Sequence, residues 1–253
     1  MELSSKFQLV LEFTKREFKL NYRNAFFGYI WSLLSPLFML TALYLVFTYV
    51  MSLSIPNYQF FLLIGIICWN FFSEATSRTI TFLHSNSNLL GKHRIDPSVL
   101  VISSCLSSAI TLVTNIVIFL VMAYFFRLYL PVFGILSLFY LILLFFFTLG
   151  ISFVLAVIYS FFRDLEHIWR LAMLVGFWIS PVLYSENVLE EGIRRIYMLN
   201  PIARIISHLR NALIYNFPNE LMQSLITCVL VLIIFLAGSY IMEAFKKGFG
   251  ERF

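Results

Sequence analysis

Residues that could do chemistry are few in this chain. None of the histidines has metal-ligand spacing to a cysteine or a carboxylate, so we predict no metal site and expect interfacial polar residues instead. They are His84, His93, His167 and His208. The one Gly-Lys step, Gly91-Lys92, is followed by His93 and has no glycine five positions earlier. It therefore cannot form a phosphate-binding P-loop. We expect no catalytic residue and no cofactor bound by this chain.

The composition is that of a membrane protein. Of 253 residues, 60% are apolar and 12% are charged, with a mean hydropathy of +0.88. Soluble domains carry about a quarter charged residues, so soluble enzymes, nucleic-acid binders and disordered proteins are poor interpretations. Three cysteines lie within apolar runs and are expected to be reduced and buried. The N-terminal residues 1–24 mix basic and acidic side chains and have no continuous apolar core, so no signal peptide is predicted.

Two opposite charges, Glu74 and Arg78, interrupt one apolar run. Their i,i+4 spacing predicts a local ion pair near a helix end. A lipid-modifying membrane enzyme would need acids or histidines clustered at one face, whereas Asp164, Glu166 and His167 belong to another segment. An enzyme of this kind, for example a lipid-phosphate transferase, remains an alternative. Activity of the purified chain on a lipid substrate would support it.

The expected fold is an all-α integral membrane protein in a single domain, residues 1–253. Residues 2–21 predict an amphipathic helix, either lying in the membrane interface or packed on a partner. Six apolar segments follow, each long enough to cross a bilayer of about 30 Å. They span residues 27–52, 58–82, 98–126, 132–161, 166–184 and 220–244.

The positive charges predict the orientation. Twelve lysines and arginines fall on the side of the two termini and five on the other, with Arg78 near the first side. Because cytoplasmic loops are enriched in such residues, both termini are predicted to be cytoplasmic.

The stretch between the fifth and sixth segments is too polar to span a membrane. Two acid–base pairs, Glu190–Arg194 and Glu191–Arg195, predict a helix over residues 187–198. Asn200-Pro201 then predicts a capped helix that runs to about Tyr215. We expect a short two-helix re-entrant or surface-lying hairpin over residues 187–215 on the outer side.

An ordered set of motifs resembles the ABC-2 type permeases of polysaccharide export, most closely those for O-antigen, with capsule and teichoic-acid permeases related. The resemblance covers essentially the whole chain. Its motifs are Gly28, Trp31, Pro36, Gly65, Trp69-Asn70-Phe71-Phe72, Asn88-Leu89-Leu90, Lys92, Pro97, Arg163-Asp164-Leu165, Trp178-Ile179-Ser180-Pro181-Val182-Leu183-Tyr184, Asn200-Pro201 and Arg210.

The resemblance implies a homodimer in the cytoplasmic (inner) membrane with two separate ATP-binding cassette subunits, which would bind ATP and Mg. The chain itself would not be an enzyme and would bind no nucleic acid. The implied cargo is polysaccharide linked to a lipid diphosphate. Gradient-driven carriers usually need ionisable groups deep in the membrane, and the sequence offers only Glu74 and Arg78 near that depth.

The resemblance also assigns two contact regions. Residues 84–98 would form a cytoplasmic coupling helix, although a solvated turn is the alternative. Its candidate ATPase contacts are Leu89, Leu90, Lys92 and Arg94. The candidate gate residues are Arg163, Asp164, Asn200, Pro201 and Arg210. Arg163 and Asp164 are expected either to pair across the inner mouth or simply to end a helix.

Two residue sets are candidates for cargo contact. Aromatic rings can stack on the C–H faces of sugars, although core or lipid packing is the alternative for each ring. The candidate channel aromatics are Tyr29, Trp31, Tyr44, Trp69, Phe71, Phe72, Tyr159 and Trp178. Basic residues at the membrane entry could grip a diphosphate or anionic membrane lipid. These are Arg16, Lys19, Arg23 and the adjacent Tyr22. An ABC-2 permease for a small lipophilic drug or lipid stays the nearest alternative.

Overall fold

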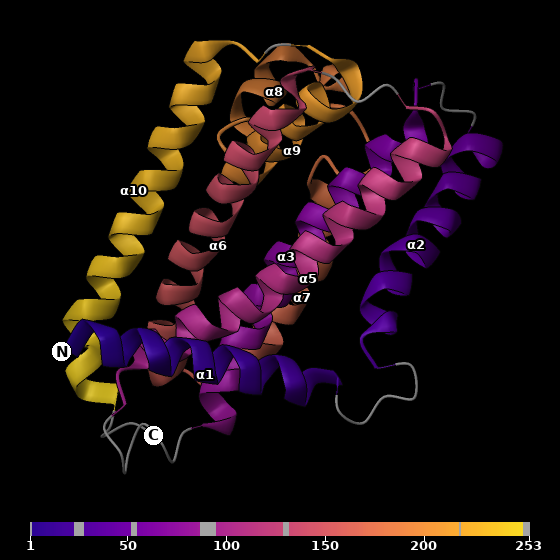
Figure 1. Cartoon of the computed structure of the whole chain (residues 1–253). Coiled ribbons are helices and arrows are strands. Elements are labelled where there is room, and N and C mark those ends of the chain that lie inside the picture. Colours follow the sequence, from indigo (N-terminus) through magenta and orange to yellow (C-terminus); the bar gives the residue numbers. More distant parts are fainter. Residues whose placement is uncertain are drawn as a thin grey trace.

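The computed structural model describes residues 2–22, 28–51, 55–86, 95–128, 132–217 and 219–249. Within these residues the fold is helical and contains no strand. Five helical stretches are long and apolar enough to cross a membrane (Figure 1). They are α2 (Ile30–Leu45) continued by η1 (Val46–Val50), α3 (Tyr58–Ser85), α5 (Pro97–Phe125), α6 (Leu136–Phe161) and α10 (Leu221–Phe245). The all-helical membrane class is therefore confirmed.

The fifth predicted segment, residues 166–184, forms a shorter helix than expected. Helix α7 covers Leu165–Ile179, and its 15 residues extend about 22 Å at the usual rise of 1.5 Å. That length falls short of the roughly 30 Å of a bilayer core. The helix ends because Ser180, which precedes Pro181, adopts an extended conformation. The count of six crossings stays a prediction.

Helix α1 (Glu2–Tyr22) lies across one end of the bundle, nearly at right angles to the long helices (Figure 1). Its inner face packs on α5, where the Ser103 hydroxyl donates a hydrogen bond of 3.1 Å to the carbonyl of Val10. Val10 and Phe13 are buried, whereas the apolar residues Phe7 and Leu11 are exposed. The predicted amphipathic helix is confirmed, and its exposed apolar residues suit a membrane interface.

Helix α3 is the centre of the bundle and contacts α2, α5, α6, α7 and α9 (Pro201–Arg210). Its upper half is almost wholly apolar and buried, from Tyr58 to Trp69. At the edge, α10 packs on α6 through Gly150 and Gly238. A Cβ on Gly238 would lie 2.2 Å from the Gly150 carbonyl oxygen, so the two backbones meet without side chains. Small residues allow such close helix packing in membrane proteins.

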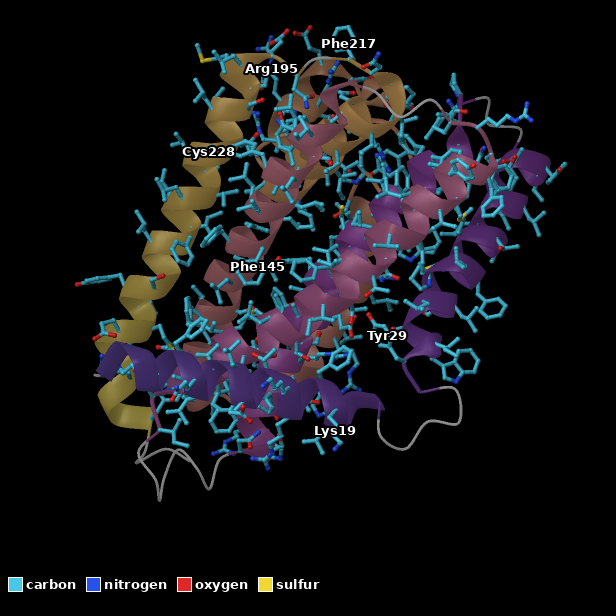
Figure 2. The ribbon with its side chains drawn as sticks, in the orientation of Figure 1. Lys19, Tyr29, Phe145, Arg195, Phe217 and Cys228 are labelled. Atoms are coloured by element: carbon cyan, nitrogen blue, oxygen red, sulfur yellow. The ribbon has the colours of Figure 1, made fainter. Side chains whose placement is uncertain are left out.

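Two short helices close the end of the bundle opposite α1 (Figure 1). After the turn η3 (Glu186–Val188), α8 covers Glu191–Tyr197, and α9 continues into η4 (Asn211–Tyr215). The Asn200 side chain caps α9 by accepting a hydrogen bond of 3.2 Å from the amide of Ile202. A short helix thus lies within each predicted range, although α8 is shorter than the predicted 187–198, and the re-entrant or surface-lying placement of the hairpin stays a prediction. Figure 2 shows Arg195 at this end and Lys19 at the other.

Candidate functional site

The lower half of α3 carries a row of polar residues on one face. Their spacings of three and four place them on one side of a helix. They are Asn70, Ser73, Glu74, Ser77, Arg78 and Thr81, which we call the α3 polar stripe. Within the stripe, Arg78 donates a hydrogen bond to Glu74 and forms an ion pair with it, as predicted.

Two cavities flank the α3 polar stripe. The α7 cavity lies between α2, α3 and α7 and has a volume of about 680 Å³. The α5 cavity lies between α1, α2, α3 and α5 and has a volume of about 610 Å³. Asn70, Ser73 and Ser77 line both cavities. The stripe is therefore their shared wall, and both volumes fall in the usual range for ligand pockets.

Aromatic rings form one wall of the α7 cavity. Trp69 and Phe177 pack edge to face with ring centroids 6.4 Å apart, and Trp178 follows at 5.8 Å from Phe177. Trp178 is 57% exposed, so its ring is open to a ligand or a partner. A Cβ on Gly176 would lie 2.7 Å from the Trp69 indole, so glycine at this position admits the ring. The cavity thus joins flat apolar faces to hydroxyl and amide groups.

The predicted channel aromatics separate into two groups. Trp31 lines the α5 cavity, and Trp69 and Trp178 line the α7 cavity. The other five line neither of these cavities. Phe71, Phe72 and Tyr159 are buried in the core, Tyr44 packs near Tyr58, and Tyr29 hydrogen-bonds Thr114. Of the eight predicted channel aromatics, three tryptophans therefore line one of these two cavities.

Arg210, at the end of α9, is the most heavily bonded predicted gate residue and is 2% exposed. Its Nε and Nη2 donate to the carbonyl of Phe61 at 3.1 and 3.0 Å. Its Nη1 donates to Pro181 at 2.6 Å, and Nη2 also donates to Val182 at 2.9 Å. The guanidinium carbon lies 3.3 Å from the centroid of the Phe61 ring. Arg210 therefore fastens α9 to α3 and to the turn after α7.

Burial lowers the pKa of Arg210 to about 10, so the guanidinium stays charged at neutral pH. Three carbonyl oxygens and an aromatic face compensate the buried charge. Gly65 leaves the space for it.

The hairpin also buries polar residues that sequence reasoning missed. His208 is 5% exposed, stacks on Tyr140 with centroids 4.8 Å apart, and shares a 3.0 Å hydrogen bond with Thr227. Its predicted interfacial placement is therefore wrong, because the ring sits between α6, α9 and α10. Ser207 donates to Glu186. The signal in the sequence is that Ser207 and His208 stand between the apolar residues Ile206 and Leu209 of α9.

The remaining gate residues sit at helix ends. Asn200 and Pro201 begin α9 as predicted. Arg163 and Asp164 are exposed between α6 and α7. The Arg163 guanidinium lies 5.9 Å from the centroid of the Tyr159 ring. Pairing of Arg163 with Asp164 across a mouth stays a prediction.

The basic residues predicted at the membrane entry are described only in part. Arg16 and Lys19 are exposed on α1, whereas the side chain of Tyr22 and all of Arg23 lie outside the described residues. The four candidate ATPase contacts lie outside them as well. These are Leu89, Leu90, Lys92 and Arg94.

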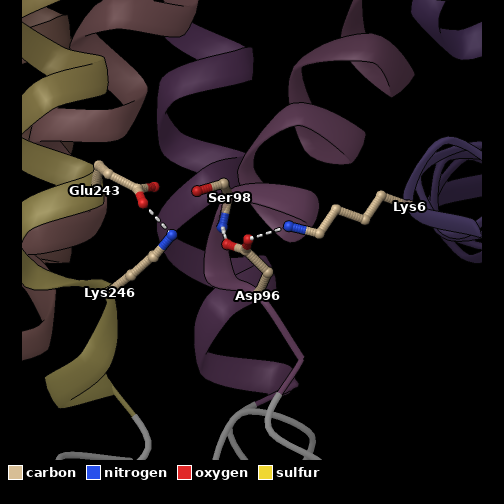
Figure 3. Close-up of polar contacts among 5 residues, drawn as sticks. All are labelled: Lys6, Asp96, Ser98, Glu243 and Lys246. Atoms are coloured by element: carbon tan, nitrogen blue, oxygen red, sulfur yellow. Dashed lines mark hydrogen bonds and ion pairs between the residues drawn. The ribbon is translucent and has the colours of Figure 1, made fainter. Parts of the chain in front are cut away.

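An ionic cluster marks where the chain leaves the candidate coupling region. Asp96 caps α5 by accepting from the Ser98 amide at 3.0 Å and pairs with Lys6 of α1 at 3.4 Å (Figure 3). Lys246 pairs with Glu243 at the end of α10 in the same cluster (Figure 3). Helix α1 is thereby tied to the last residues of the candidate coupling segment, residues 84–98.

These features define a helical membrane protein with cavities of mixed apolar and polar lining among its helices and, in its sequence, no P-loop of its own. Residues 8–214 match the family described as ABC-2 type transporter. The match covers most of the chain, which therefore belongs to the ABC-2 type transporter family.

Curated relatives refine the family. The chain is similar to the O-antigen export system permease protein RfbA of Myxococcus xanthus, with 28% identity over 96% of this chain and 94% of the relative. The protein of that name from Klebsiella pneumoniae is 26% identical over 79% of this chain and 78% of its own. The polysialic acid transport protein KpsM of Escherichia coli is 21% identical, covering 81% of each chain. The chain is thus a transport permease subunit rather than an enzyme.

Proposed function

We propose that this chain forms, as a homodimer, the membrane conduit of an ATP-driven exporter. The exporter moves polysaccharide linked to a lipid diphosphate across the cytoplasmic membrane, and O-antigen is the first candidate cargo. The similarity to the O-antigen export permease of Myxococcus xanthus over 96% of the chain carries this proposal. Both termini would be cytoplasmic, which places α1 at the inner face and the α8–α9 hairpin at the outer face.

The α7 cavity supports a glycan as cargo. Sugar rings carry apolar C–H faces and polar hydroxyls, and this cavity offers Trp69 and Trp178 beside Asn70 and Ser73. Such a surface holds many sugars weakly and lets a repetitive chain slide. Capsule polysaccharide is the second candidate cargo, favoured by the similarity to a polysialic acid transport protein.

The exposed apolar helices support a dimer. Both α2 and α7 present large apolar side chains outward, including Phe38, Leu171, Leu174 and Trp178. The α7 cavity is lined by residues of these same two helices and of α3. A second copy packed there would turn the open cavity into an enclosed conduit and bury the tryptophan.

Energy would come from two ATP-binding cassette subunits that hold ATP and Mg. Residues 84–98 would receive their movement, with Leu89 and Leu90 seated in a cleft of the ATPase and Lys92 and Arg94 facing its acidic groups. Arg163, Asp164, Asn200, Pro201 and Arg210 would form the gates. A diphosphate at the inner face would meet Arg16, Lys19, Tyr22 and Arg23.

Deletion in the host tests the function. We expect surface polysaccharide to disappear and lipid-linked glycan to accumulate on the cytosolic face, with recovery when the wild-type chain is restored. Leu89→Asp should abolish co-purification of the ATPase, with Gln8→Asp on the exposed face of α1 as the control. Normal surface glycan after deletion, with a small lipophilic compound retained instead, would favour the drug or lipid permease.

A further inference from the structure

We propose that the α5 cavity is a binding site for an uncharged, hydroxyl-rich sugar segment of the cargo, separate from any site for the diphosphate. The inference rests on the proposed function and adds to it a second contact for the glycan. Its lining includes residues of α1 and of the lower half of α3. Helix α1 lies at the end of the molecule that would face the cytoplasm (Figure 1).

The lining has the chemistry of a sugar site. Six hydroxyls and two amides face about 610 Å³ of space. The hydroxyl groups belong to Ser32, Ser35, Ser73, Ser77, Thr81 and Thr111. Hydroxyl and amide groups both donate and accept hydrogen bonds, so they match sugar hydroxyls in either direction. Trp31 adds a ring that is 48% exposed and can stack on a sugar face.

One buried polar atom in this cavity lacks a hydrogen-bond partner within the described structure. Asn115 of α5 lines the cavity and is 6% exposed, and its Oδ1 accepts no hydrogen bond. A buried amide oxygen is costly to leave without a donor. A sugar hydroxyl placed in the cavity would supply that donor.

The charges of the cavity select against an anion. Glu17 and Glu74 line it together with Arg78, whose guanidinium is already paired with Glu74. Among the described lining residues a phosphate group would meet two carboxylates, and the one guanidinium there is already engaged by Glu74. Carboxylates accept hydrogen bonds from sugar hydroxyls, so the same charges favour an uncharged glycan.

The two cavities share a wall along the α3 polar stripe. Asn70, Ser73 and Ser77 face both spaces, so a sugar can exchange hydrogen bonds from the α5 cavity to the α7 cavity without leaving polar groups. The α5 cavity would hold the glycan near the inner face, and the tryptophan wall of the α7 cavity would receive it next.

Cysteine protection tests the site. In a Cys228→Ser background, which leaves Cys68 and Cys105 buried, Ser35→Cys or Thr81→Cys would be reacted with a methanethiosulfonate reagent in cells. The complex would carry an ATPase unable to hydrolyse ATP, so that cargo stalls. We expect the labelling rate to fall at least threefold in cells that make the lipid-linked glycan, relative to cells that do not. Gln8→Cys, exposed on α1, should label equally in both.

Where the unblocked complex still delivers glycan to the surface, either of two results would overturn the site: equal labelling with and without glycan, or no labelling in either strain. Failure of the unblocked complex to deliver glycan would instead overturn the proposed function, and the site with it. As a second measure, Asn115→Leu should slow export about tenfold because it removes the acceptor. Ser107→Ala, on the same helix and outside the cavity lining, should not.

Discussion

Arg210 occupies the space that Gly65 leaves on α3. A Cβ at position 65 would lie 2.7 Å from Nη2 of Arg210 and 3.0 Å from the carbonyl oxygen of Val182. The arginine side chain could bend away, but the backbone of Val182 could not move without shifting the turn after α7. The glycine therefore sets how closely α3, α7 and α9 approach one another.

A larger residue at position 65 should separate these elements. We expect Gly65→Leu to lower the thermal unfolding temperature of the purified chain and to stop glycan export, because the Arg210 hydrogen bonds would break. Gly192→Leu is the matched control, since a Cβ there meets nothing within 4 Å. Unchanged unfolding and export for Gly65→Leu would contradict the close packing.

Arg210 itself should not tolerate lysine. Lysine keeps the charge but replaces a planar fork with a single point, so it cannot reach the carbonyls of Phe61, Pro181 and Val182 together. Hydrogen bonds from charged donors contribute roughly 1.5–3 kcal/mol each, so Arg210→Lys should lower the free energy of unfolding by about 3 kcal/mol. Arg195→Lys, on the exposed face of α8, should change it little. Equal stability of the two variants would rule out the clamp.

Sequence patterns predicted helices well and contacts poorly. Apolar length located the spanning helices, and the Asn200-Pro201 pair located the start of α9 because capping is a local property. Only the end of α7 was predicted too late, because apolar composition continues past Ile179 while the Ser180-Pro181 conformation ends the helix. His208 was misplaced because its partners, Tyr140 and Thr227, come from distant helices.

The aromatic residues also show that local patterns predict helices better than they predict contacts. Composition predicted ring-lined space, but the choice of rings depends on the rotation of each helix about its axis, so Phe71 and Phe72 lie in the core while Trp69 reaches the α7 cavity. Asn115 and Glu17 were missed for the same reason. Their helices become neighbours only after folding, which leaves no local spacing to recognise.

The indole of Trp69 should depend on Gly176. Gly176→Leu would push the ring out of the wall of the α7 cavity, and loss of one aromatic contact would slow export up to about tenfold. Surface glycan measured by immunoblot after induction would report the rate. Gly134→Leu, where a Cβ meets nothing within 4 Å, should export normally. Co-purification of the ATPase should be unchanged in both, and its loss would show a packing defect instead.

The α8–α9 hairpin should lose stability in mild acid through His208. Burial lowers the pKa of His208 below its ordinary value of 6.5, so the folded chain favours the neutral ring. The unfolded chain binds the proton first as the pH falls below 6.5, and the resulting loss of stability continues down to the folded pKa. His208→Gln should show a smaller decrease between pH 7 and 5, measured by thermal unfolding. The exposed His167→Gln should decrease like the wild type.

The source of energy tests the central claim most directly. The chain would be reconstituted in vesicles with its ATPase and a lipid-linked glycan, and glycan movement across the bilayer would be measured with ATP and, separately, with a proton or sodium gradient. We predict movement only with both the ATPase and ATP present. Movement driven by a gradient in vesicles that contain this chain alone would contradict the account.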